Sequence, residues 1–291
     1  MKTAFIGLGV MGYPMAGHLA AQGHQVCVYN RTRSQAERWV NEYGGSMALT
    51  PAAAVKGVDI AFACVGNDDD LRSVTVGAEG AFSGLRPNTI FVDHTTASAN
   101  VARELHALAK ESGFAFLDAP VSGGQAGAEN GVLTVMIGGD REAFDVAKPL
   151  IDCFAKAAML MGDSGAGQLT KMVNQICIAG LVQSLSESVA FAINAGLDPK
   201  QVFDVISKGA AQSWQMDNRH ETMIANEFEF GFAVDWMRKD LGLCFEEAGR
   251  NGSELPIARI IDTFYAEVQA KGGNRFDTSS LLTRLPRKDL N

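Results

Sequence analysis

Six residues near the amino terminus have the spacing of a dinucleotide-binding turn. The stretch Gly7-Leu8-Gly9-Val10-Met11-Gly12 follows an apolar run and leads into a helical pattern, so its glycines match G-x-G-x-x-G. The first glycine permits a tight turn, the second lets a pyrophosphate approach the backbone, and the third allows close helix–strand packing. N–H groups at the helix start and the helix dipole then favour phosphate. These residues predict a dinucleotide cofactor.

The end of the next apolar run indicates which cofactor is preferred. Sites for NAD(H) usually place a carboxylate there to bind the ribose hydroxyls. This chain instead has Asn30-Arg31-Thr32. A guanidinium pairs with a 2′-phosphate that a carboxylate would repel, and a threonine hydroxyl can donate to it. We therefore expect NADP(H) to be preferred over NAD(H), the alternative being that Arg31 is a solvated surface arginine.

Two further segments follow the third and fourth apolar runs, Val65-Gly66-Asn67 and His94-Thr95-Thr96. The carboxyl ends of parallel strands meet at the edge where such cofactors bind. Val65, Gly66 and Thr96 are therefore candidates to line the cofactor groove, although ordinary loops would have the same composition.

A third segment has residue types that suit a carboxylate ligand. The fifth run ends in Asp118-Ala119-Pro120-Val121 and continues into Ser122-Gly123-Gly124. Glycines leave backbone N–H groups accessible, and Ser122 adds a hydroxyl donor. We predict a substrate-carboxylate site at Ser122, Gly123 and Gly124, with a flexible turn as the alternative.

A lysine and two carboxamides lie on one face of a predicted helix. Lys171, Asn174 and Gln175 are three and four positions apart, and their neighbours are mainly apolar. An ammonium in such surroundings needs a partner or a chemical task. These three residues are candidate catalytic groups, unless Lys171 is a lysine that only extends to solvent from the helix start.

The elements around these residues predict an α/β fold. Apolar strand-like runs alternate with helical patterns up to Gly162, which favours a mainly parallel, doubly wound Rossmann-type sheet. The predicted strands are Thr3–Leu8, Gln25–Asn30, Asp59–Val65, Thr89–Asp93, Ala115–Ala119, Leu133–Ile137 and Ala158–Met161. A helical pattern without proline then extends from Ala166 to Ala195, about 45 Å at ~1.5 Å per residue. Further helical patterns follow at Pro199–Lys208, Asp235–Asn251 and Pro256–Lys271. We predict a dinucleotide-binding domain over residues 1–163, an all-helical substrate and oligomerisation domain over 164–291, and a long helix between them.

Composition narrows the class of protein. The 291 residues are 47% hydrophobic and carry a net charge of -8, which argues against a nucleic-acid partner. The cysteines and histidines lack ligand spacing, so we expect no metal and a reducing, cytoplasmic setting. No uninterrupted apolar run reaches the ~18 residues of a membrane span, and the strand begins at Thr3, so we expect neither membrane segment nor signal peptide. The helical half is rich in apolar residues, including Phe228, Phe230, Phe232 and Trp236, which predicts a homodimer or homotetramer.

Together these motifs resemble the β-hydroxyacid dehydrogenase family over nearly the whole chain. The resemblance rests on Phe5–Gly12, Asp118–Gly124, Gly165–Lys171 and Lys239-Asp240-Leu241. It implies that Lys171 is catalytic, that Ser122, Gly123 and Gly124 bind a substrate carboxylate, and that Thr96 and Lys239 contact the cofactor.

One position departs from the family pattern. Many members have asparagine four residues after the lysine, where this chain has Gln175 preceded by Asn174. The carboxamide role therefore stays open between the two. The implied reaction is hydride transfer between NADP(H) and a small aldehyde acid or hydroxy acid: succinic semialdehyde, tartronate semialdehyde, glyoxylate or 3-hydroxyisobutyrate. The alternatives are an imine reductase, which shares the architecture but typically lacks the lysine, and a dinucleotide sensor without turnover.

Overall fold

The chain folds into two compact units, Met1–Lys171 and Met172–Asn291. The computed structural model describes residues 1–288, so residues 289–291 of the predicted second domain lie outside the described part. The division falls inside the long helix α8 (Ala166–Asn194), somewhat later than the boundary predicted after residue 163. The α/β class and the helical second half are confirmed.

Unit 1 is built on a nine-stranded sheet of order β3-β2-β1-β4-β5-β6-β8-β7, with β9 also paired to β8. The strands are β1 (Lys2–Ile6), β2 (Gln25–Tyr29), β3 (Ser46–Met47), β4 (Ile60–Ala63), β5 (Ile90–Asp93), β6 (Ala115–Asp118), β7 (Val121–Ser122), β8 (Leu133–Gly138) and β9 (Ala155–Gly162). Pairing is parallel except where β8 meets β6 and β7. From β1 the chain proceeds outward to β3 and then returns to β4, so the strand order reverses beside β1. Ligands of such sheets bind outside the carboxyl ends at this reversal.

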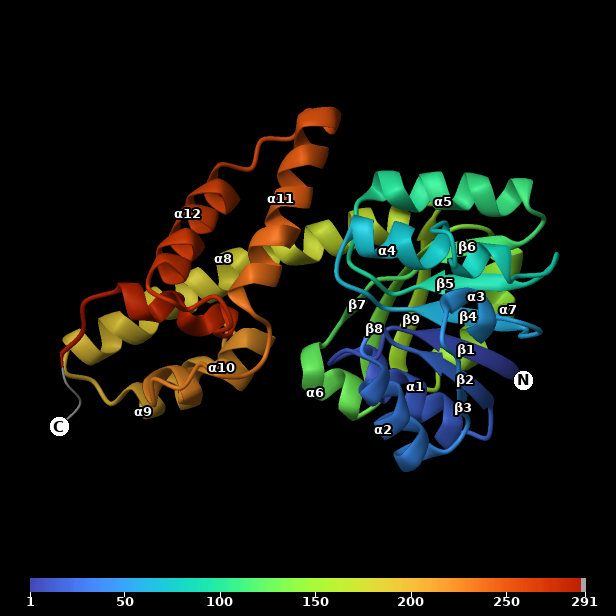
Figure 1. The fold of residues 1–291 in the computed structure, drawn as a ribbon. Helices are drawn as coiled ribbons and strands as arrows, with labels where there is room; N and C mark the ends of the chain where they lie inside the picture. The colour runs from blue at the N-terminus through green and yellow to red at the C-terminus, as the bar shows by residue number, and fades with distance from the viewer. Residues whose placement is uncertain (289–291) are drawn as a thin grey trace. The chain divides into compact units, whose positions relative to one another are not determined.

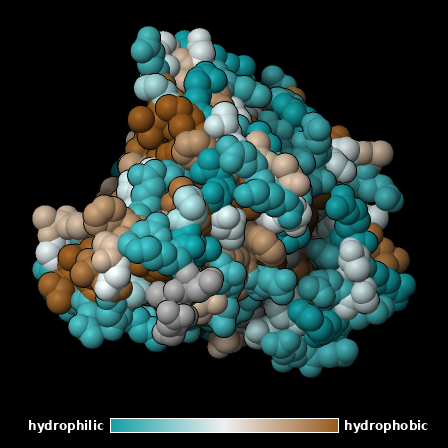
Figure 2. Space-filling view, turned by 90° about the vertical axis from the view of Figure 1, so that its left-hand side faces the viewer, coloured by the Kyte–Doolittle hydropathy of each residue, from teal (hydrophilic) through white to brown (hydrophobic). Residues whose placement is uncertain are grey.

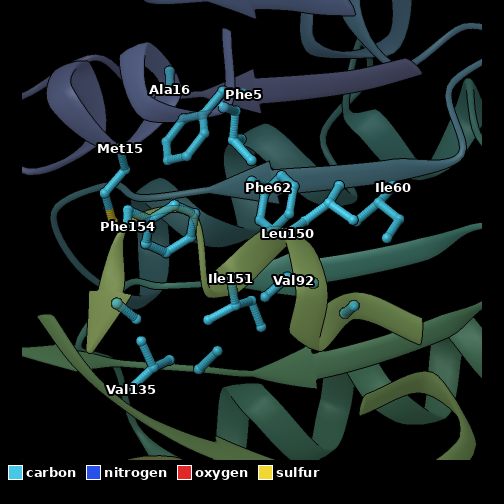
Figure 3. Close-up of a cluster of buried hydrophobic side chains, with 14 of the residues drawn as sticks. Phe5, Met15, Ala16, Ile60, Phe62, Val92, Val135, Leu150, Ile151 and Phe154 are labelled. Atoms are coloured by element: carbon cyan, nitrogen blue, oxygen red, sulfur yellow. The ribbon is translucent and has the colours of Figure 1, made fainter. Parts of the chain in front are cut away.

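Alternate residues of the central strands point to opposite faces of the sheet, and each face has its own core. Phe5, Phe62 and Val92 pack beneath α1 and α7, as Figure 3 shows. Ile6 and Phe91 belong to the second core, under α3, α4 and α5. Both faces are thus apolar, as expected for a sheet covered by helices on both sides.

The helices of unit 1 cover both faces (Figure 1). They are α1 (Gly12–Ala21), α2 (Arg33–Tyr43), α3 (Pro51–Ala54), α4 (Asp68–Thr75), the 3-10 turn η1 (Ala81–Ser83), α5 (Ala99–Glu111), α6 (Gly124–Glu129) and α7 (Arg141–Ile151). Side-chain caps define several starts: Asn67 accepts from the N–H of Asp70 at 2.8 Å, and Ser98 accepts from the N–H of Val101 at 3.0 Å.

Unit 2 is helical. After α8 it contains α9 (Pro199–Ile206), α10 (Trp214–Ile224), α11 (Val234–Asn251), α12 (Pro256–Ala270) and the 3-10 turn η2 (Thr278–Arg284). One apolar cluster joins α8 to α11 and α12, and another joins α8 to α9 and α10. The helix α10 was not predicted, although Ser213, whose hydroxyl accepts from the N–H of Met216, is a typical N-cap.

The helix α8 is long and apolar enough to cross a membrane by length and composition, with a mean hydropathy of 1.7 over its most apolar window. The expectation of no membrane segment rested only on the absence of a long uninterrupted apolar run, and polar residues interrupt the apolar ones of α8. Half of that window is buried within the protein, and a core helix has the same composition. On the surface, unit 2 exposes Val173, Phe191 and Val205. Figure 2 shows hydrophobic residues gathered in patches among hydrophilic ones on the face that it views.

Candidate active site

The glycine-rich turn lies at the carboxyl end of β1, where the strand order reverses. Gly7 has a φ of +92°, and its N–H donates to the Tyr29 carbonyl at 2.8 Å. A Cβ at Gly7 would overlap the carbonyl oxygen of Cys64, and one at Gly12 would overlap that of Gly7. Gly9 differs, because nothing lies within 4 Å of a Cβ built there. Gly7 and Gly12 therefore allow close packing, while Gly9 leaves open space beside the backbone.

The start of α1 fits a phosphate group. Its N-cap residue Met11 makes no side-chain hydrogen bond to the first turn, and Val10 is exposed. The N–H groups of a helix start attract anions when no side chain caps them. Together with the open side of Gly9, this arrangement fits the pyrophosphate of a dinucleotide.

The three residues after β2 have different roles. The Asn30 carboxamide oxygen accepts from the N–H of Leu8 at 2.9 Å, and its nitrogen donates to the Thr32 carbonyl at 3.0 Å. Asn30 thereby ties the glycine turn to the end of β2. Thr32 is the N-cap residue of α2 and makes no side-chain cap bond. Arg31 has an 86% exposed side chain whose guanidinium lies 3.2 Å from Asp70. Because exposed ion pairs are weak, the Arg31 guanidinium can leave Asp70 for a phosphate at little cost in free energy.

The segments after β4 and β5 are joined to each other. The N–H of Val65 donates to the Thr95 hydroxyl at 3.0 Å, which places the predicted residues Val65, Gly66 and Thr96 on two connected loops at the carboxyl edge of the sheet.

Beneath these loops lie two fully buried titratable groups. Burial raises the pKa of Asp93 to about 7, although the N–H of Thr95 donates to one carboxylate oxygen at 3.0 Å. The other oxygen has no hydrogen-bond partner in the described part of the chain. Burial lowers the pKa of His94 to about 4, and the His94 Nδ1 lies 2.7 Å from the Ala119 carbonyl. The imidazole is therefore neutral near pH 7.

Asp93→Asn should stabilise the protein at alkaline pH. A carboxyl whose pKa is raised in the folded state contributes stability below the unfolded value near 3.8, and that stability is lost as pH rises towards 7. The amide cannot ionise, so the variant should gain roughly 1–4 kcal/mol over the parent at pH 8 and much less at pH 5. Urea unfolding at the two pH values measures the difference. Asp59→Asn, at an exposed position, should show no such pH-dependent gain, and an equal gain at both pH values would contradict the prediction.

The predicted carboxylate site follows β6. Ser122 ends the two-residue strand β7, and Gly123 and Gly124 have φ values of +133° and +63°. Residues other than glycine rarely adopt such angles. Backbone turns with such φ values can form anion-binding concavities.

The long helix α8 carries the predicted catalytic residues. Lys171 is buried near its start and is the last residue of unit 1. In unit 2, the Gln175 nitrogen donates to Asp240 at 2.7 Å, and the Asn174 nitrogen donates to the Gln175 oxygen at 2.8 Å. On α11, Lys239 lies 3.0 Å from the same Asp240 carboxylate. The carboxamides and Lys239 thus form one network, with Gln175 holding α8 to α11. Which carboxamide acts in catalysis stays a prediction.

Two buried polar residues, Asp118 and Gln168, had no predicted role of their own. Both are almost fully shielded from solvent, and both make hydrogen bonds around the start of α8. The sequence signal that could have identified them is that Asp118 lies four residues before Ser122 and Gln168 three residues before Lys171. Within residues 1–288 no cluster of three or more His, Cys, Asp or Glu side chains is arranged to hold a metal ion.

Two protein-family models together match nearly the whole chain. Residues 2–162 match the model described as the NAD binding domain of 6-phosphogluconate dehydrogenase. Residues 165–285 match the model described as NAD-binding of NADP-dependent 3-hydroxyisobutyrate dehydrogenase.

Individual proteins are similar to this chain over nearly its whole length. An uncharacterized oxidoreductase of Shewanella frigidimarina is 63% identical over 98% of both chains. The 2-hydroxy-3-oxopropionate reductase of Escherichia coli is 34% identical over 98% of this chain and 97% of its own. The solved structure of Mycobacterium tuberculosis 3-hydroxyisobutyrate dehydrogenase with L-serine has a TM-score of 0.87 at 30% identity. It covers 97% of this chain, and the match spans 98% of that one.

Proposed function

Because this chain belongs to the β-hydroxyacid dehydrogenase family, we propose that it transfers a hydride between NADP(H) and a small aldehyde acid or hydroxy acid. Family membership makes it an NAD(P)-dependent oxidoreductase of the hydroxyacid dehydrogenase type. The preference for the phosphorylated cofactor, the substrate and the residue roles are the proposal.

One observation in particular carries the proposal. The buried Lys171 lies near the start of a helix whose first N–H groups are bound by Asp118, and Ser122 lies four residues beyond Asp118. The proposed proton donor and the proposed carboxylate-binding groups are thereby attached to the same strand end. A carboxylate substrate needs both when its carbonyl is reduced.

Lys171 would act on the carbonyl oxygen. Its ammonium donates a hydrogen bond to that oxygen and delivers a proton as negative charge develops there. In the opposite direction the neutral amine takes the hydroxyl proton. The bound nicotinamide supplies or accepts the hydride.

Ser122, Gly123 and Gly124 would hold the other end of the substrate. The hydroxyl and the two backbone N–H groups donate to its carboxylate, which orients the reacting carbon. Asn174 or Gln175 would orient the lysine or the carbonyl oxygen, while Thr96 and Lys239 contact the cofactor, as in the family.

The substrates proposed are succinic semialdehyde, tartronate semialdehyde, glyoxylate and 3-hydroxyisobutyrate, with reduction of the aldehyde acid as the main direction. The relative from Escherichia coli, named as a reductase of 2-hydroxy-3-oxopropionate, supports an aldehyde acid. A misfitting methylene costs only ~1–3 kcal/mol, so overlapping activity on several of these acids is expected.

NADPH should be the better cofactor on this panel, and Arg31→Ala should remove most of that preference. A charge-assisted contact is worth ~1.5–3 kcal/mol, so the variant should raise the KM for NADPH about ten- to hundredfold and leave that for NADH nearly unchanged. Initial rates with both cofactors measure this. Arg141→Ala removes a similarly exposed arginine on α7 and serves as the control. Equal or better turnover of the parent with NADH would refute the preference.

The same rates separate the alternatives. A dinucleotide sensor would bind the cofactor without turnover, and an imine reductase would reduce cyclic imines better than aldehyde acids. The expected homodimer or homotetramer stays a prediction, which the mass of the protein in solution would test.

A further inference from the structure

The start of α8 is held by the carboxylate of Asp118, at the end of β6. One carboxylate oxygen accepts from the N–H of Gly165 at 2.7 Å, and the other accepts from the N–H of Gln168 at 3.0 Å. The first N–H groups of a helix have no partner within the helix, and a negative charge there is favourable. Asp118 is completely buried. This bridge therefore joins the helix start to the sheet in the protein interior.

Two glycines allow the helix start to lie directly against the strand ends. A Cβ at Gly167 would be 2.5 Å from the Met136 carbonyl oxygen and 2.6 Å from that of Asp118. A Cβ at Gly138 would be 2.6 Å from an oxygen of the Asp118 carboxylate. Such distances leave no room for a side chain. The position of the helix start is thus set by backbone contact, and not only by flexible side chains.

The side chain of Gln168 makes a second attachment, to the loop after β5. Its oxygen accepts from the N–H of Ala97 at 3.0 Å, and its nitrogen donates to the Thr95 carbonyl at 2.7 Å. Gln168 is 1% exposed, so both bonds are shielded from water. The two bonded residues flank Thr96, which the proposed function places against the cofactor.

We propose that Asp118 and Gln168 are positioning residues that set Lys171 relative to the carboxylate-binding segment and the cofactor-binding loop. Lys171 is one helical turn beyond Gln168, and Ser122 is four residues beyond Asp118. The two side chains therefore tie together the three segments that the reaction needs. The inference rests on the proposed function, because it assumes that Lys171 acts on the substrate.

Gln168→Met tests the positioning role, because methionine keeps the volume and loses both hydrogen bonds. A misplacement of about 1 Å can cost about 10²-fold in rate. We expect kcat with a carboxylate aldehyde to fall about 10- to 100-fold, with its KM within about threefold of the parent. The primary isotope effect with deuterated NADPH should rise, because hydride transfer then limits turnover.

Gln183→Met is the matched control. Gln183 is another buried glutamine of α8, and it donates to Glu187 within the same helix. Its replacement should keep kcat within about twofold, and the melting temperatures of both variants show how far a loss of activity follows from a loss of stability. Equal effects of the two substitutions on kcat would overturn the positioning role and leave Gln168 as a purely structural residue.

Gln168→Glu adds a pH readout. A carboxylic acid at this position can accept from Ala97 and donate to Thr95 only while it is protonated. The variant should regain activity relative to Gln168→Met at low pH and lose it as pH rises, with a limb that the parent profile lacks. An unchanged profile would contradict the role of the two bonds.

Hydrogen exchange tests, without any substrate, whether the Asp118 carboxylate holds the N–H groups at the start of α8. Asp118→Asn places an amide donor against a backbone donor, so the amides of Gly165 and Gln168 should exchange at least about tenfold faster, equivalent to ~1.4 kcal/mol. Faster exchange with an unchanged kcat would overturn the positioning role of Asp118, although it would confirm that Asp118 holds the start of α8. A parent without turnover of any aldehyde acid would instead refute the proposed function, and the exchange result would still be readable.

Discussion

Lys171→Ala is expected to abolish turnover while the protein still binds its cofactor. Loss of a positioned proton donor typically lowers the rate about 10²–10⁴-fold. The dissociation constant for NADPH should change less than about threefold, since the proposed phosphate contacts are to the glycine turn and Arg31 and do not include Lys171. Steady-state rates and a fluorescence titration with NADPH measure the two quantities.

Burial of Lys171 requires a control for folding. Lys171→Met preserves most of the side-chain volume and should lose as much activity as the alanine variant. Lys148→Ala removes a half-exposed lysine of α7 that pairs with Asp152, and it should retain the parental rate. If Lys171→Met kept more than roughly a tenth of the parental kcat, the lysine would be structural.

Succinic semialdehyde should be reduced about 10²–10⁴-fold more efficiently than butanal, measured as kcat/KM with NADPH. The aldehydes have equal length and differ in the carboxylate. Without an anion, donors at Ser122, Gly123 and Gly124 would lose two or more charge-assisted hydrogen bonds of ~1.5–3 kcal/mol each. Because the carboxylate orients the carbonyl carbon, part of the loss should appear in kcat.

A competition experiment separates this site from general affinity for aldehydes. Succinate carries the carboxylate and lacks the aldehyde, so it should inhibit competitively against succinic semialdehyde, whereas butanol should inhibit far less. Comparable kcat/KM values for succinic semialdehyde and butanal would refute a carboxylate site in the Ser122–Gly124 segment.

The α/β class could be predicted because its signals are local. The central strands of this sheet are apolar on both faces, so they appeared as short hydrophobic runs bounded by turn residues. The long helix was predicted over Ala166–Ala195 and extends over Ala166–Asn194. Two strands were missed, β3 and β7, because two residues are too few to show a period. The antiparallel pairing of β8 was missed too, since register depends on partners distant in sequence.

The candidate site likewise has features that local sequence predicts and features that only the tertiary structure shows. The amino-acid sequence by itself determined which groups could do chemistry: the glycine turn, Arg31, the Ser122–Gly124 segment and Lys171, each a motif of neighbouring residues. Only the tertiary structure decided what holds them. Asp118 binds amides 47 and 50 residues away, and Gln175 pairs with an acid 65 residues away. Such bonds form between segments that folding brings together, and no local spacing encodes them, because a buried polar group can be satisfied by any partner that the fold supplies.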